Sequence, residues 1–114
     1  MVAELSTRER GEAVLDSGLT YDGIAPVLVR VTKRGRRYRF SDCGAAVAAA
    51  GATVSRRALP DHIRLGERSV NVSGRGAVWL PAIESAGEAW LAEVPRLVAE
   101  ASVALYERLL DASG

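Results

Sequence analysis

The chain has 114 residues, of which 48% are hydrophobic and 25% are charged, so we expect one soluble domain with a single core. It contains no apolar run of the roughly 18 residues that a transmembrane helix needs, and its first residues lack the basic-then-apolar pattern of a secretory signal. The single cysteine excludes an internal disulfide and favours a reducing, cytoplasmic location.

The formal net charge of +1 hides an uneven distribution of charge along the chain. Residues 1–29 have two bases and five acids, residues 30–75 have eleven bases and three acids, and residues 82–111 have two bases and six acids. Either the acidic segments neutralise the basic one, within the fold or across a dimer, or the basic segment binds a polyanion.

The first predicted element is a helix from about Thr7 to Ser17. Ser6-Thr7-Arg8-Glu9 matches a capping box, in which the serine hydroxyl and the glutamate carboxylate satisfy free amides of the first turn. Gly18 is expected to end this helix.

A β-hairpin is predicted next, from Ile24 to Ser41. The stretch Ile24–Thr32 is rich in β-branched residues, which strands prefer. With Arg34-Gly35 as the two-residue loop, Val31 faces Tyr38, Val29 faces Phe40, and these four side chains point to the core. The same register places Arg30 opposite Arg39 and Thr32 opposite Arg37 on the outer face.

This hairpin holds six basic residues and no acid between positions 30 and 39. Like charges directly across a strand pair destabilise it. The ordinary interpretation is a solvated face with acidic neighbours, and the functional one is a surface for an anion or nucleic acid. The candidate binding surface is Arg30, Lys33, Arg34, Arg36, Arg37 and Arg39.

The turn Asp42-Cys43-Gly44 leads into an alanine-rich helix that ends at Gly51, with Ser41 or Asp42 as its expected N-cap. Cys43 would lie in the first turn of this helix, a position that favours a reactive thiol. A cysteine nucleophile also needs a base, and the chain has one histidine, His62. We therefore treat Asp42, Cys43 and Gly44 as a candidate turn site, with Cys43 more simply a small, inert residue and Asp42 a cap.

A second hairpin is predicted around Gly66-Glu67-Arg68-Ser69, with Ile63, Leu65, Val70 and Val72 on one face. The segment Thr53–Leu59 before it suits either a strand or a connector. A last short strand, Ala77–Leu80, is expected to stop at Pro81. In this hairpin and strand His62 is expected at the surface, and Trp79 either in the core or exposed beside Pro81.

The C-terminal part is predicted to be helical, with a capping box at Ser85-Ala86-Gly87-Glu88. Because proline interrupts helix hydrogen bonds, we expect a short helix over residues 86–92 and a longer one that starts near Pro95. The longer helix is apolar on two sides, so its second side packs on another helix of the chain or forms a homodimer through residues 95–110.

The pattern of Asp22-Gly23, a strand, Ser41-Asp42-Cys43-Gly44, an alanine-rich helix and Gly51 resembles a small bacterial and phage domain family of unknown function. The later run from Val70 to Pro81 and the helix around Ala104-Leu105-Tyr106 look like uncharacterised actinobacterial proteins of similar length. The resemblance implies a compact α+β domain of a bacterial cytoplasm and no particular activity.

The sequence thus predicts a single α+β domain over residues 1–114. An antiparallel sheet of four to five strands, from two hairpins and a short strand, packs against a C-terminal helical segment, with a short alanine-rich helix and an N-terminal helix. No catalytic set, metal-ligand spacing or cofactor motif stands out, so a non-enzymatic binding or regulatory module is favoured, which contacts nucleic acid or another polyanion such as an acidic protein. The alternatives are a module that self-assembles through its C-terminal helix and a small cysteine-dependent enzyme.

Overall fold

The computed structural model describes residues 10–51 and 59–113. Its elements follow one another along the chain as β1 (Arg10–Tyr21), β2 (Ala25–Arg34), β3 (Arg37–Ser41), α2 (Ala45–Ala50), β4 (His62–Leu65), β5 (Arg68–Val72), β6 (Val78–Ile83), the 3-10 turn η2 (Glu84–Ala86) and α3 (Glu88–Ser113). The predicted α+β class is confirmed, although the described residues form six strands where four to five were expected.

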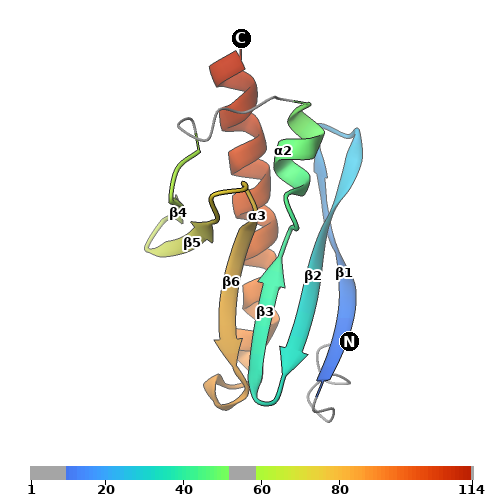
Figure 1. Cartoon of the computed structure of the whole chain (residues 1–114), viewed down its shortest axis with the longest axis vertical. Helices are drawn as coiled ribbons and strands as arrows, with labels where there is room; N and C mark the ends of the chain where they lie inside the picture. The colour runs from blue at the N-terminus through green and yellow to red at the C-terminus, as the bar shows by residue number, and fades with distance from the viewer. Residues whose placement is uncertain (1–9, 52–58, 114) are drawn as a thin grey trace.

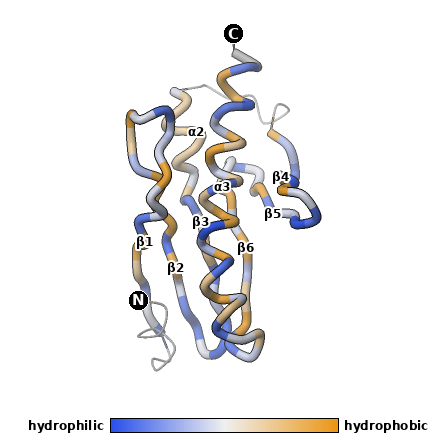
Figure 2. Tube along the Cα trace, turned by 180° about the vertical axis from the view of Figure 1, so that it is seen from behind, coloured by the Kyte–Doolittle hydropathy of each residue, from blue (hydrophilic) through white to orange (hydrophobic). Residues whose placement is uncertain are grey.

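The strands form one antiparallel sheet in the order β1-β2-β3-β6-β5-β4. The long helix α3 lies behind the sheet, and α2 packs beside α3 at one end (Figure 1). Figure 2, seen from behind, shows α3 in front of β3 and β6, running roughly along them. Both described helices therefore cover the same side, and we call the other side the open face.

The core lies between the sheet and α3. Val27, Val29 and Val31 of β2 are fully buried, as are Val98 and Leu105 of α3. Each such side chain stabilises the fold by about 1.5–3 kcal/mol. The strict alternation of buried and exposed residues along β2 and β3 therefore fixes which side of the sheet meets the helix.

The predicted N-terminal helix is wrong where the structure describes it, because residues 10–17 belong to β1. Ala13, Leu15 and Ser17 turn partly inward, while the residues between them are exposed, which is the period of two of a strand. Pairing with β2 satisfies the backbone, and the glycine expected to end a helix lies within a register shift between Asp16 and Thr20. The predicted capping box of residues 6–9 and most of the segment 53–59 lie outside the described residues.

The first hairpin has the predicted core side chains but a different register. Val31 pairs with Phe40, and Lys33 pairs with Tyr38, so the two-residue loop is Gly35-Arg36. The partners differ from the prediction by two positions. Because side chains alternate with a period of two, this shift leaves every residue on its predicted face, and Val29, Val31, Tyr38 and Phe40 are all buried.

The last strand does not stop at Pro81, because β6 continues to Ile83. Asp42 donates its amide to the Val78 carbonyl, and Glu84 donates its amide to the Arg36 carbonyl. The hydrogen-bonded positions of β6 toward β3 are therefore the even ones. The nitrogen of Pro81 points away from β3, toward a side where the pairing of β6 with β5 has already ended, so the missing N–H costs no ladder bond.

The C-terminal segment is one helix, although the sequence predicts two. Pro95 lies inside α3, where it removes the hydrogen bond to the Leu91 carbonyl. The helix continues because Leu91, Val94 and Val98, on either side of the proline, are buried in the core. The second hairpin and the alanine-rich helix are confirmed: Ile63, Val70 and Val72 are buried, and Gly51 ends α2 in the left-handed conformation.

Gly76 shows how closely α2 packs on the turn before β6. Its φ is +85°, and a Cβ at this position would overlap the Val47 side chain of α2. We expect Gly76→Ala to lower the free energy of unfolding by about 2–3 kcal/mol in urea denaturation, since strain and a clash add.

Gly66 is the matched control, because it has a φ of +63° but nothing within 4 Å of its would-be Cβ. Gly66→Ala should cost about 1 kcal/mol, and Val47→Ala should recover part of the loss in the Gly76→Ala background. Equal losses at the two glycines, with no recovery, would contradict this packing.

Candidate functional site

The part of the open face that β1, β2 and β3 form contains five exposed arginines. They are Arg10 on β1, Arg30 and Arg34 on β2, and Arg37 and Arg39 on β3. Arg10 pairs with Arg34, and Arg34 pairs with Arg37. Three arginines therefore stand side by side on three neighbouring strands, about 5 Å apart. We call these five residues the basic face.

Four of the six predicted surface residues belong to the basic face. Arg36 is exposed in the hairpin loop, and its backbone carbonyl accepts the Glu84 amide at 2.8 Å. Lys33 is placed differently: it is 3% exposed on the core side, with Nζ 5.7 Å from the centre of the Tyr38 ring. Arg10 was not predicted, because residues 7–17 were expected to form a helix, and a helix does not alternate exposed and inward residues as β1 does.

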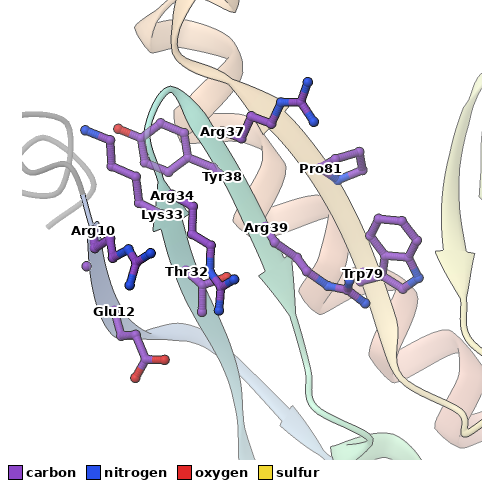
Figure 3. Close-up of a pocket in the computed structure, with 11 residues that line it drawn as sticks. Arg10, Glu12, Thr32, Lys33, Arg34, Arg37, Tyr38, Arg39, Trp79 and Pro81 are labelled. Carbon is purple, nitrogen blue, oxygen red and sulfur yellow. The ribbon is translucent and has the colours of Figure 1, made fainter.

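A shallow depression of about 790 Å³ lies on this face between β1, β2, β3 and β6. Figure 3 shows side chains that line it, with the Arg39 guanidinium beside the ring of Trp79. The guanidinium carbon is 4.3 Å from the centroid of that ring, a cation–π contact. Trp79 is half-buried on the open face, so of the two predicted locations for this residue the structure supports the surface.

The basic face lacks ion pairs within the described part of the chain. None of its arginines has a described carboxylate within 4.0 Å. The ion pair among the described residues joins Arg68 to Glu93, away from this face. The strands place two acids on the open face, Glu12 and Asp16. Like charges directly opposite each other cost about 0.2–1 kcal/mol per pair, so the arginine row lowers stability, and no described carboxylate lies within 4.0 Å of its arginines.

The acidic residues are concentrated on the other side of the molecule. Helix α3 has five acids and two arginines, and its acidic residues within the described side chains are exposed. Because the buried stripe of α3 packs on the sheet, these carboxylates lie on the helix side. Among the described residues, the acidic helix therefore does not pair with the basic face.

The candidate turn site centres on a buried carboxylate. Asp42 is 3% exposed. Its Oδ1 accepts the amides of Gly44 and Val78, both at 2.8 Å, and its Oδ2 accepts the Ser102 hydroxyl at 2.7 Å and the Ala46 amide at 3.5 Å. Gly44, not Asp42, occupies the N-cap position of α2, but Asp42 still binds amides of that turn.

A buried chain of hydroxyls extends from this carboxylate. Because Ser102 donates to Asp42, the Tyr21 hydroxyl is the donor in its 2.6 Å bond to Ser102. Burial and the nearby Asp42 charge raise the pKa of Tyr21, against a smaller lowering by Ser102. Burial and the carboxylate of Asp22 also raise the pKa of Tyr106, whose ring lies 5.3 Å from that of Tyr21. These hydrogen bonds join β1, the end of β3, β6 and α3, so their role is structural.

Cys43 is exposed, with a positive φ of 57°. It lines a second depression, of about 670 Å³, together with Gly44, Arg39 and Arg75. His62 is not near: it belongs to the row Ser41–Trp79–Asn71–His62, so three strand spacings, about 14 Å, separate it from the β3 end of that row. The Asp42 carboxylate is turned to the interior. Among the residues that the structure describes, Cys43 is thus not assembled with His62 or with the Asp42 carboxylate.

The two apolar sides of α3 are used within the chain. Leu97, Val98 and Leu105 are buried against the sheet, and α2 packs on the helix as well. Tyr106 is buried, and Val103 and Leu110 are half-buried. Among the described residues, the large exposed hydrophobic side chains all lie outside α3, so this helix offers little apolar surface for a homodimer.

Two further findings apply to residues 10–51 and 59–113. No group of three or more His, Cys, Asp or Glu side chains there is arranged to hold a metal ion. None of the helices in that part of the chain is both long and apolar enough to cross a membrane.

Comparison of the chain with protein-family models, curated proteins and solved structures gave no significant match. The resemblance of the Asp22-Gly23 and Ser41–Gly44 pattern to a bacterial and phage family stays an expectation. The case for a function therefore depends on the geometry of the open face.

We predict that Asp42→Ala lowers the free energy of unfolding by at least about 3 kcal/mol, because it leaves the Val78 amide and the Ser102 hydroxyl without their buried acceptor. Urea denaturation measures the loss. Asp16 is the matched control: its carboxylate also accepts an amide two residues ahead, from Gly18 at 2.9 Å, but at an exposed site. Asp16→Ala should cost less than about 1 kcal/mol, and equal losses would contradict the structural role of Asp42.

Stability should also decrease at alkaline pH. The pKa values of Tyr21 and Tyr106 are raised in the folded state above 10.0, so the unfolded chain loses these protons first. The free energy of unfolding therefore falls as pH rises above about 10 and through the folded-state pKa values. Urea denaturation between pH 8 and 11 should show a shallower fall for Tyr21→Phe/Tyr106→Phe than for the native sequence. An equally steep fall in both would refute this linkage.

Proposed function

We propose that this protein is a non-enzymatic module that binds nucleic acid through the basic face. The observation on which the proposal depends is the row Arg10–Arg34–Arg37, three arginines directly opposite one another with no described carboxylate in reach. Such a row destabilises the sheet, and an array of phosphates would offset that repulsion.

The chemistry of the side chains supports phosphate as the ligand group. Guanidinium groups bind phosphate oxygens through paired N–H donors, and the row is continued by Arg39 and Arg30 along the same two strands. The helix side is acidic, so a polyanion would be attracted to one side of the molecule and repelled from the other.

The first test is binding of a fluorescein-labelled 20-nucleotide strand and of its duplex, measured by anisotropy from 50 to 200 mM salt. Contacts of five arginines with phosphates predict a slope of log K against log salt of about −3.5 for a single strand and about −4.5 for a duplex. From 50 to 200 mM salt these slopes correspond to a loss of affinity of about 130-fold for the single strand and about 500-fold for the duplex. A flat salt response, or no binding at 50 mM salt, would remove the proposal.

The second test is charge reversal. Arg34→Glu plus Arg37→Glu should lower nucleic-acid affinity at least tenfold and flatten the salt slope, since two phosphate contacts become repulsive. Arg96→Glu plus Arg108→Glu changes the net charge equally, but on exposed positions of α3, and should change affinity less than threefold. Equal losses would mean that overall charge, not the basic face, determines binding. Competition by polyglutamate as strong as that by the oligonucleotide would instead favour an acidic protein partner.

A further inference from the structure

We infer that the ligand of the basic face is a single-stranded nucleic acid whose bases stack at Trp79 and Arg39. This inference rests on the proposed function, because it assumes that the arginines bind phosphates. It adds the class of nucleic acid and the residues that distinguish a single strand from a duplex.

The first observation is an aromatic ring on the correct face. The other aromatic side chains of the described strands, Tyr21, Tyr38 and Phe40, are at most 2% exposed in the core. Trp79 of β6 is on the open face, where it is partly exposed. It lines the same depression as Arg10, Arg34 and Arg37. A partly exposed aromatic residue among arginines is an arrangement on which unpaired bases can stack.

The second observation is the contact between Trp79 and Arg39. The guanidinium is 4.3 Å from the ring centroid, so both flat groups of the pair stand together at the edge of the depression (Figure 3). Bases stack on arginine planes as well as on aromatic rings. Arg39 can therefore hold a base with its plane while the neighbouring arginines hold phosphates.

The third observation is the shape of the face. Both described helices lie on the other side of the sheet (Figure 1), so neither of them is on this face to enter a major groove. Its depression, of about 790 Å³, is within the range of pockets that hold small organic groups, about 300–1,000 Å³. Unpaired bases can enter such a depression, whereas the paired bases of a duplex stay stacked inside the helix and offer only phosphates.

The fourth observation is a path for the strand. Arg37 and Arg39 follow each other along β3, about 7 Å apart. Arg39 also lines the second depression, next to Gly44 and Arg75. A strand that follows β3 from the hairpin loop therefore meets basic groups in succession and ends beside Cys43. This length suits a few nucleotides, at the lower end of the 4–16 that single-strand modules cover.

The decisive experiment uses the two tryptophans of the chain as separate reporters. In Trp90→Phe, the remaining fluorophore Trp79 should be quenched by a single-stranded 20-mer of DNA or RNA and much less by the matching DNA duplex. In Trp79→Phe, the remaining Trp90, on α3 beside Arg68, should respond to neither. The DNA and RNA arms show which sugar is preferred, and quenching in either arm supports the inference.

Affinity variants give an independent readout. Trp79→Leu and Arg39→Lys should each weaken single-strand binding at least tenfold, as expected for the loss of one stacked base, and weaken duplex binding less than threefold. Arg39→Lys keeps the positive charge and removes the planar guanidinium on which a base can stack, so it remains informative if Trp79→Leu misfolds. Arg68→Lys is the matched control, since Arg68 also stacks on a tryptophan, 4.8 Å from the Trp90 ring, but on the helix side.

The outcomes separate the two proposals. Equal binding of single strand and duplex, with no response of Trp79 fluorescence, would overturn the single-strand inference and leave the proposed function in place. Absence of binding to any nucleic acid at 50 mM salt would overturn both.

Discussion

The hydrogen bonds of the Asp42 carboxylate determine how the sheet and the long helix fit together. Asp42 lies at the end of β3, yet it accepts the amide of Val78 at the start of β6 and the hydroxyl of Ser102 in the middle of α3. Through Ser102 it also reaches Tyr21 at the end of β1. One buried carboxylate thus joins elements that are far apart in sequence, and a different placement of α3 would remove the Ser102 hydroxyl from Asp42 and from Tyr21.

This attachment has a consequence for charge. With α3 held on one side, the alternation of β2 and β3 leaves Arg30, Arg34, Arg37 and Arg39 on the other. The acids of α3 point away from them. Of the two interpretations of the uneven charge, neutralisation within one chain does not extend to the basic face: no described carboxylate lies within 4.0 Å of its arginines, and the described ion pair between the two segments joins Arg68 to Glu93. The fold instead places the basic face on the side that the described helices leave uncovered, and the acids of α3 on the opposite side.

The sequence predicted the face of the sheet that a residue occupies better than it predicted the residue's cross-strand partner. Val29, Val31, Tyr38 and Phe40 were assigned to the core because their alternation is strong, and a loop placed one residue early changed their partners but not their side. The segment 10–17 was misassigned because two of its inward residues, Ala13 and Ser17, are small, and Gly11 weakens either pattern. Pro81 and Pro95 were misjudged for one reason: a proline disrupts structure only where its missing N–H was needed, and that depends on neighbours the sequence does not reveal. Arg10 and Trp79 joined the candidate site only when those errors were corrected.

The separation of charge onto two sides also governs how the protein meets a ligand at a distance. A net charge of +1 gives almost no overall attraction, so the molecule acts mainly as an electric dipole. Its field fades within the Debye length, about 8 Å at physiological salt. A polyanion therefore interacts weakly with the protein until it is within that distance. At shorter distances the dipole turns the basic face of the sheet toward the polyanion and the acidic helix away from it. Encounter is then selective for orientation before any contact forms.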